Sequence, residues 1–306
     1  MAAFRPFILA IDVEPAPRHG VRGDPAEWEG FERCVEHLAP WRGLALERTG
    51  RPLRISWFLR CDPQVAAYGS DGWVLDHFAV LIGALQAQGD EFGLHVHPFR
   101  RNTDGAWQQD WTDERRICET VASAVGIYER ALGRVRYFRM GDGWLSESVV
   151  AQLEALGVEY DLTVEPGRSP KPYLPPDIGF TADYRRAPRL PYRPSRHDFL
   201  TPDETGGRAL RIVPVTTGCF DHPHVLHPAG EAHRIEVLHL SFDPAFVRPF
   251  IDFTLRSGQL TVAVTRTGDL AWSRHLLANF DYLLGHPDLD RVAIEPPAPA
   301  VERQAN

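Results

Sequence analysis

Cysteines are few in this chain, and no recognisable motif pairs them. The 306 residues include four cysteines, which are widely spaced and form no CxxC motif. Such usage fits a reducing compartment better than a disulfide framework, so we expect each one to be a small buried side chain. The four are Cys34, Cys61, Cys118 and Cys219.

The sequence also lacks a long apolar run and an excess of basic residues. No apolar run approaches the roughly 20 residues of a membrane-spanning helix, and residues 1–6 contain no apolar core of a secretion signal. The formal net charge is −8 at pH 7, which disfavours non-specific binding to nucleic acid or to anionic membranes. We therefore expect a cytoplasmic protein with no nucleic-acid partner and no membrane span.

The composition is otherwise that of a globular protein, with 43% hydrophobic residues. No internal repeat and no second composition regime divides the chain, so we expect one domain over residues 1–295. The Pro- and Ala-rich residues 296–306 are expected to form a disordered tail.

Strand-like and helix-like segments alternate along the chain, which predicts a parallel sheet with crossover helices. The first five are strands at 7–11, 53–59 and 91–97 and helices at 28–44 and 74–88. Later strands are expected at 135–138, 157–161, 210–215, 234–239 and 260–264, and later helices at 113–132, 147–156, 244–257 and 271–284. Residues 162–208 are rich in Pro, Gly and Arg and lack periodicity, which predicts an irregular insertion that walls the active site.

Two histidines one residue apart end the strand at 91–97. Because side chains alternate along a strand, His95 and His97 face the same way, which suits metal ligands. An isolated pair of this kind more often has one packed and one exposed histidine. The metal interpretation gains weight because Asp12 and Glu14 end the first buried strand, and the carboxyl ends of parallel strands meet at one edge.

Arginine and aromatic side chains in the loops are candidates for binding substrate. Solvation of the surface explains the arginines equally well. The candidates are Arg60, Arg100, Trp107, Trp144 and Tyr192. A second histidine cluster, formed by His222, His224 and His227, is either a separate zinc site or a loop that happens to contain histidines.

Several of these stretches together resemble the polysaccharide deacetylase family, also called the NodB-homology or carbohydrate esterase family 4 domain. They are the acidic pair after the first strand, the EFGLH strand, the Arg after YF and the stretch LGVEYDLTVEP. The resemblance covers most of the chain. It implies a distorted TIM-like (β/α) barrel of seven strands, a divalent metal that is usually zinc, and hydrolysis of an N-acetyl or related amide.

The resemblance also implies roles for individual residues. Asp12 matches the catalytic base, Glu14 the metal-binding acid and His95 the first histidine of the second motif. The second histidine of that motif falls on Phe99, so either His97 replaces it as a ligand or the site is degenerate.

The remaining motifs match at three positions. Arg139 matches the residue that orients the base, although the usual following Pro is missing. Asp161 matches the fourth motif, and His239 resembles the histidine that protonates the leaving amine. We expect Asp161 to be the partner that orients His239 and raises the pKa of its imidazole.

Three functions remain open from the sequence. The first is a metal-dependent hydrolase of carbon–nitrogen bonds other than peptide bonds, with Glu14, His95 and His97 as ligands. It would remove an acyl group from an N-acetylated sugar or glycan precursor, nucleotide-linked or lipid-linked. The second is a metal hydrolase acting on a phosphoester. The third is a metal-free barrel that only binds glycans.

Overall fold

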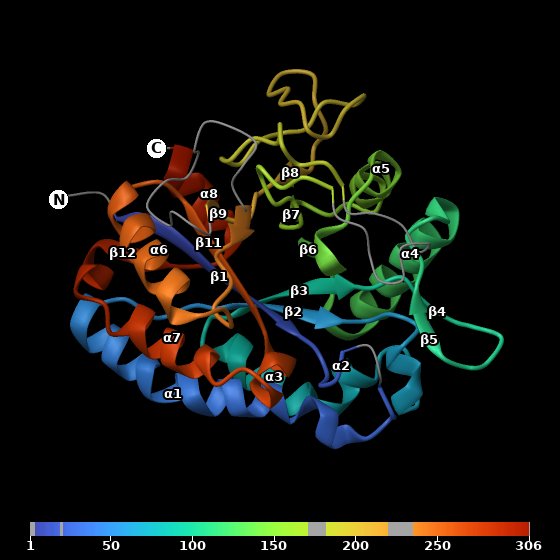
Figure 1. Ribbon diagram of the computed structural model, residues 1–306, viewed down its shortest axis with the longest axis horizontal. Helices are drawn as coiled ribbons and strands as arrows, with labels where there is room; N and C mark the ends of the chain where they lie inside the picture. The colour runs from blue at the N-terminus through green and yellow to red at the C-terminus, as the bar shows by residue number, and fades with distance from the viewer. Residues whose placement is uncertain (1–3, 19–20, 171–181, 220–234, 306) are drawn as a thin grey trace.

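The centre of the molecule is a curled parallel sheet with helices on its outer side (Figure 1). The computed structural model describes residues 4–18, 21–170, 182–219 and 235–305. Seven strands run in the order β11-β1-β2-β3-β6-β7-β8, which confirms the expected distorted (β/α) barrel. Their bounds are β1 Arg5–Val13, β2 Ser56–Arg60, β3 Glu91–Val96, β6 Tyr137–Met140, β7 Tyr160–Asp161, β8 Arg211–Ile212 and β11 Thr261–Arg266.

The register of the sheet gathers the polar strand ends at one edge. Asp12 on β1 lies opposite Arg266 on β11, and His95 on β3 lies opposite Arg60 on β2 and Arg139 on β6. All of these pairings are parallel, so the carboxyl ends of the strands point the same way. An edge of this kind is where barrel enzymes keep their chemistry.

The predicted helices are present, and side-chain caps begin several of them. Asp113 accepts a hydrogen bond from Arg116 N–H before α4, and Asp243 accepts one from Ala245 N–H before α6, which satisfies backbone donors left open at helix starts. The predicted helix at 74–88 is two helices broken at Phe78. The bounds are α1 Glu29–Thr49, α2 Trp73–His77, α3 Ala79–Ala87, α4 Glu114–Leu132, α5 Glu147–Ala155, α6 Pro244–Ser257 and α7 His275–Leu284. Short 3-10 helices are η1 Pro25–Trp28, η2 Val65–Tyr68, η3 Gly141–Gly143, η5 Thr267–Ala271 and η6 Pro287–Arg291.

Irregular backbone hydrogen bonds join the two ends of the sheet, β8 and β11. Thr216 N–H donates to Val262 O at 3.1 Å, and Val264 N–H donates to Leu238 O at 2.9 Å. Within the described part of the predicted strand at 234–239, the structure has β10 Ile235–Val237, which pairs antiparallel with β9 Thr217–Cys219. A single parallel bridge then joins His239 to Val264, so His239 reaches the same edge as the other strand ends.

Two stretches contain regular structure that was not predicted from the sequence. The loop after His97 is a hairpin of β4 Phe99–Arg101 and β5 Trp107–Gln109. The tail expected to be disordered forms α8 Pro297–Ala305, so that expectation was wrong. Gln304 accepts a hydrogen bond from Leu260 N–H just before β11 begins, which places α8 at the amino-terminal end of the barrel. Ala300 is fully buried there, and this burial explains why an alanine-rich segment is ordered.

The remaining features bear on the other expectations. The parts 162–170 and 182–208 contain no helix or ladder strand, only isolated bridges such as Tyr192 with Ile212.

All four cysteines are free, and three are buried, whereas Cys118 on α4 is only partly buried. A last strand, β12 Val292–Ile294, extends the sheet beside the start of β1. Of the helices in the described part of the chain, none combines the length and apolarity that crossing a membrane requires.

Candidate metal centre and active-site cavity

Three predicted metal ligands converge at the carboxyl ends of β1 and β3. Glu14 Oε1 lies 3.0 Å from His95 Nε2 and 2.5 Å from His97 Nε2. The two Nε2 atoms are 3.0 Å apart, and all three side chains are buried. His97 therefore points inward with His95, as the alternation of a strand predicts.

Hydrogen bonds orient the two imidazole rings from behind. His95 Nδ1 lies 2.8 Å from the carbonyl oxygen of Arg139, to which it donates, so the lone pair of Nε2 faces Glu14. His97 Nδ1 lies 2.7 Å from Nε2 of Gln109, which donates to Asp142 Oδ2 at 2.6 Å, so Gln109 links this carboxylate to the ring. Contacts of this kind behind a ligating histidine are a common support of metal sites because they fix the orientation of the ring.

The charges in this cluster already favour a cation. Burial raises the pKa of Glu14, but positive charge and hydrogen bonds from His97 and His95 outweigh it and hold that pKa well below its usual value. Burial lowers the pKa of His97, but the charge of the Glu14 carboxylate more than offsets this effect and raises that pKa above its usual value. A metal ion would take the place of the proton that this cluster attracts. Two imidazole nitrogens and one carboxylate are the donor set of catalytic zinc sites, so the residues fit such an ion.

Gly141 allows the turn η3 to lie flat against the ring of His97. A Cβ on this residue would lie 2.2 Å from both Nδ1 and Cε1 of His97. The next residue, Asp142, has φ 54°, a left-handed conformation that is uncommon outside glycine. The turn thus keeps a strained backbone that presents the Asp142 carboxylate to His97.

Asp12 and Arg139 form a buried pair beside the candidate metal centre. Arg139 Nε donates to Asp12 Oδ2 at 3.0 Å, and Nη1 donates to Leu162 O at 2.7 Å. Burial lowers the pKa of Arg139, but the charge of Asp12 more than offsets it and raises that pKa. Within the described residues, Asp12 Oδ1 is buried without a hydrogen-bond partner. A carboxylate with one oxygen free to accept a proton is what a general base requires.

The expected pairing of His239 with Asp161 was wrong. Asp161 accepts hydrogen bonds from Thr163 O–H at 2.6 Å and Thr163 N–H at 3.2 Å, and burial raises its pKa to about 6. Thr163 in turn accepts from Met140 N–H at 2.8 Å. Asp161 therefore supports the end of β6 from inside the core. The carboxylate near His239 is that of Asp269, 3.7 Å from Nε2.

The pKa of His239 also moves opposite to expectation. Burial and the positive charges of Arg266, Arg139 and Arg18 lower it well below its usual value. The backbone N–H of Ser241 lies 3.3 Å from His239 Nδ1, which favours a neutral ring with its proton on Nε2. His239 is therefore neutral in the resting protein.

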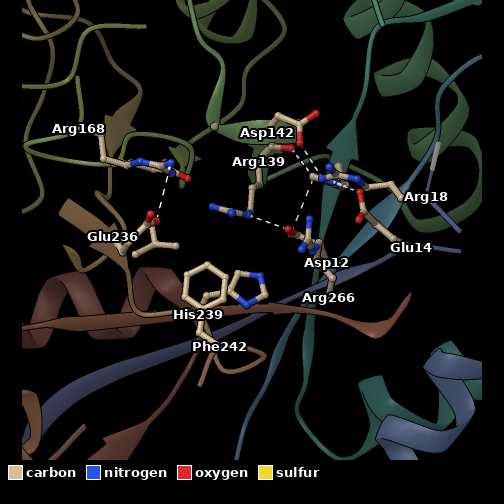
Figure 2. A pocket seen from close by; sticks show the side chains of 14 residues that line it. Asp12, Glu14, Arg18, Arg139, Asp142, Arg168, Glu236, His239, Phe242 and Arg266 are labelled. Carbon is tan, nitrogen blue, oxygen red and sulfur yellow. Dashed lines mark hydrogen bonds and ion pairs between the residues drawn. The ribbon is translucent and has the colours of Figure 1, made fainter. Parts of the chain in front are cut away.

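A cavity of about 290 Å³ is lined by Asp12, Glu14, His95, Arg139 and His239, whereas His97 and Asp161 do not border it. Figure 2 shows Asp12 and Arg139 between Glu14 on one side and Arg168 with Glu236 on the other, with His239 stacked on Phe242 below. Six charged residues that line it were not among the predicted site residues: Arg18, Asp142, Glu165, Arg168, Glu236 and Arg266. Asp142 and Glu165 follow the ends of β6 and β7, so the strand-end pattern that identified the ligands was a usable signal for both.

None of the five predicted substrate-binding residues lines this cavity. Arg60 is fully buried, donates to Asp62 at 2.5 Å and lies over the ring of Phe99 at 5.0 Å. Trp144 is buried and stacks on Trp111. These two side chains stabilise the core.

The other three candidates also have partners elsewhere. Tyr192 is buried, and its O–H donates to Phe199 O at 2.9 Å. Arg100 on β4 pairs with Asp110 at 3.0 Å, and Trp107 on β5 packs under a neighbouring arginine of the hairpin. The possible second zinc site at residues 222–227 lies outside the described residues.

Comparison with known proteins identifies the fold. No family model and no curated protein matches the chain. Among solved structures, a probable polysaccharide deacetylase from Pseudomonas aeruginosa PAO1 aligns with TM-score 0.55 and 10% identity, covering 98% of this chain and 91% of that one. A Mycobacterium smegmatis protein assigned as a polysaccharide deacetylase aligns with TM-score 0.51 and 15% identity over 100% and 91%. Puue allantoinase aligns with TM-score 0.56 and 11% identity over 98% and 90%. The chain has the polysaccharide deacetylase fold.

Proposed function

We propose that this protein is a metal-dependent hydrolase that removes an N-acetyl or similar acyl group from a sugar or glycan precursor. The observation that carries the proposal is the buried Glu14, His95 and His97 cluster. Two of its members, Glu14 and His95, line the same cavity as Asp12, whose Oδ1 has no hydrogen-bond partner among the described residues. The likeness to two solved structures described as polysaccharide deacetylases supports an acyl amide as the target.

The metal-free alternative rested on Phe99, which stands where the family has a histidine. In the structure His97 lies against Glu14 at 2.5 Å, so a second imidazole is supplied two residues earlier. This geometry favours an intact site over a degenerate one.

Each residue has a separate task in the proposed reaction. Glu14, His95 and His97 would hold the metal, which when bound supplies Lewis acidity and lowers the pKa of a water toward neutrality. Asp12 takes the proton of that water on Oδ1, while Arg139 holds Oδ2 in place.

The departing amine needs a proton, and His239 is the residue that we assign to assist its departure. Because its pKa is lowered and Nδ1 accepts from Ser241 N–H, the ring is neutral at rest and carries its proton on Nε2. This Nε2–H can donate a hydrogen bond to the nitrogen of the scissile amide, and the proton that Asp12 has taken from the water is transferred to the amine as it leaves. Asp269, and not Asp161, is the carboxylate near enough to orient this ring.

Metal content and product release test the proposal together. Protein purified without chelator is analysed for metals and incubated with N-acetylated sugars and with phosphoesters. We expect bound divalent metal and release of acetate. Phosphate release in its place would support the phosphoester alternative, and metal-free protein that cannot be reconstituted would refute the metal mechanism.

Two variants separate the metal ligand from the base. Glu14→Gln removes an ionised ligand and is expected to lose metal. Asp12→Asn is expected to keep the metal and to lose roughly 100-fold or more in kcat. If Asp12→Asn releases the metal, the two roles are reversed.

A further inference from the structure

His97 lies one residue beyond the strand that leads to it. β3 ends at Val96, and its last ladder pairs are His95 with Arg60 on β2 and Val96 with Met140 on β6. No strand in the described part of the chain therefore pairs with His97. Its side chain faces the same way as that of His95 only if another group holds its backbone in the extended conformation.

The buried carboxylate of Asp62 holds the backbone of His97. His97 N–H donates to Asp62 Oδ2 at 3.2 Å, and Asp62 is buried just after β2. Cys61 N–H donates to His95 O at 3.3 Å. In a parallel ladder that continued by one residue, the Cys61 carbonyl would accept from His97 N–H. Asp62 Oδ2 accepts in its place and so extends the pairing of β2 with β3 to His97.

Arg60 fixes the orientation of this carboxylate. Its Nε donates to Asp62 Oδ2 at 2.5 Å and its Nη2 donates to Oδ1 at 3.3 Å. Nη2 also donates to Gln64 Oε1 at 2.5 Å, and Gln64 N–H donates to Asp62 Oδ1 at 3.0 Å. A bidentate pair of this kind defines the direction of both oxygens, so Asp62 presents Oδ2 to His97 in a single orientation.

The guanidinium of Arg60 also lies over a ring that packs against His97. Its Cζ is 5.0 Å from the ring centroid of Phe99, whose ring is 5.6 Å from that of His97 at an interplanar angle of 36°. Arg60 and Phe99 are both buried. Phe99 thus packs against the guanidinium and the imidazole from the position where the family has its second histidine.

Core stability alone does not account for a buried Arg60. In other proteins, apolar residues in place of a buried ion pair often leave stability unchanged or raise it. Among the described residues, Arg60 Nη1 is buried without a hydrogen-bond partner, which costs about 1–3 kcal/mol. The contacts of the pair with His97 and Phe99 supply a second task that offsets this cost.

We propose that Arg60 and Asp62 are positioning residues that hold His97 in its metal-ligating position. Asp62 holds the backbone of His97, Arg60 orients Asp62, and Phe99 supports the ring. The inference rests on the proposed function for the presence of a metal. It explains how a histidine two residues before Phe99 completes the ligand set.

A double-mutant cycle tests whether the pair acts through His97. Arg60→Met combined with Asp62→Leu, the pair variant, removes the ion pair without leaving a buried charge unpaired. Zinc affinity is measured by competition with a chromophoric chelator, and folding by urea titration. With His97 present, we expect the pair variant to lower zinc affinity about 10–100-fold. In a His97→Ala background it should lower zinc affinity by less than about twofold, because the effect passes through His97.

Two further variants and one spectrum sharpen the test. The absorption of cobalt-loaded protein reports the ligand set, and the pair variant should resemble His97→Ala in this spectrum. Asp62→Asn keeps the volume of the side chain and is carried through the same cycle, so the test does not depend on folding of the pair variant. Arg60→Lys keeps a cation beside Asp62 and should retain most of the zinc affinity.

Arg42→Met with Asp90→Leu is the matched control. Arg42 and Asp90 form a second buried pair at 2.5 Å, and Asp90 accepts from the backbone N–H of Ile55 at 3.0 Å. Ile55 precedes β2, so this pair lies at the end of the strand remote from the metal ligands. The control should leave zinc affinity within about twofold of wild type even if it lowers stability.

Three results would overturn the positioning role. They are equal losses of zinc affinity with and without His97, wild-type affinity in a folded pair variant, and an equal loss in the Arg42 and Asp90 control. Wild type that binds neither zinc nor cobalt would overturn both this inference and the proposed function. Zinc binding that depends on Asp62 through His97, without acetate release from N-acetylated sugars, would support the positioning role and count against the proposed hydrolysis.

Discussion

Gly141→Ala tests whether the turn after β6 is what makes His97 a metal ligand. The added Cβ would lie 2.2 Å from Nδ1 and 2.6 Å from Cγ of His97. Carbon contacts are comfortable at about 3.5–4.0 Å, so the ring or the turn has to move by roughly 1 Å. If the ring is displaced, its Nε2 no longer converges with Glu14 and His95 on one metal position. Disturbing the residues behind a metal ligand typically lowers metal affinity about 10–100-fold.

The same substitution is expected to cost about 1–3 kcal/mol of stability, because it overpacks a filled site. Zinc affinity is measured by competition with a chromophoric chelator, and folding is followed by circular dichroism and thermal unfolding. Gly83→Ala is the control, since nothing lies within 4 Å of a Cβ there and the residue is in α3. A folded Gly141→Ala protein with wild-type zinc affinity would refute the role assigned to this turn.

Three further predictions concern pH, proton delivery and metal removal. Asp161 has a folded-state pKa of about 6 against an ordinary value of 3.8, so the folded state binds its proton more tightly and stability falls as pH rises from about 4 to 6. Asp161→Asn should therefore raise the free energy of unfolding above pH 6, by up to about 3 kcal/mol, and flatten this pH dependence in urea titrations; a wild-type pH profile would contradict it. His239→Ala should lower kcat on an amide roughly 100-fold or more and spare an activated ester, whose leaving group needs no proton; equal losses would make the histidine structural. Adding zinc to chelator-treated protein should raise Tm, because zinc at 100 times its Kd adds about 2.7 kcal/mol to the free energy of unfolding. Glu14→Gln should abolish this rise, and an equal rise in that variant would exclude Glu14 as a ligand.

The sequence alone located the groups that lie on strands or directly after them. Alternation within β3 was enough to place His95 and His97 on one face, and the strand-end pattern brought Asp12, Glu14 and Arg139 to the same edge. These inferences succeeded because strand periodicity and the parallel arrangement follow from short-range patterns of apolar residues.

The predictions made for loops and isolated side chains fared worse, because their partners are remote in sequence. Arg60 and Trp144 carry the chemistry of substrate binders, yet the structure uses both inside the core. Arg18 reaches the cavity from a loop whose course no local pattern describes.

The tail and the histidine partner show most clearly what only the tertiary structure decided. Residues 297–305 have a composition typical of disorder, and they are helical because the end of the barrel buries Ala300. His239 lies near Asp269 and not Asp161 because irregular hydrogen bonds, not a ladder, join the two ends of the sheet and set its position. Local patterns determine which residues form strands and which way they face, whereas the free energy of packing remote segments together determines which side chains meet.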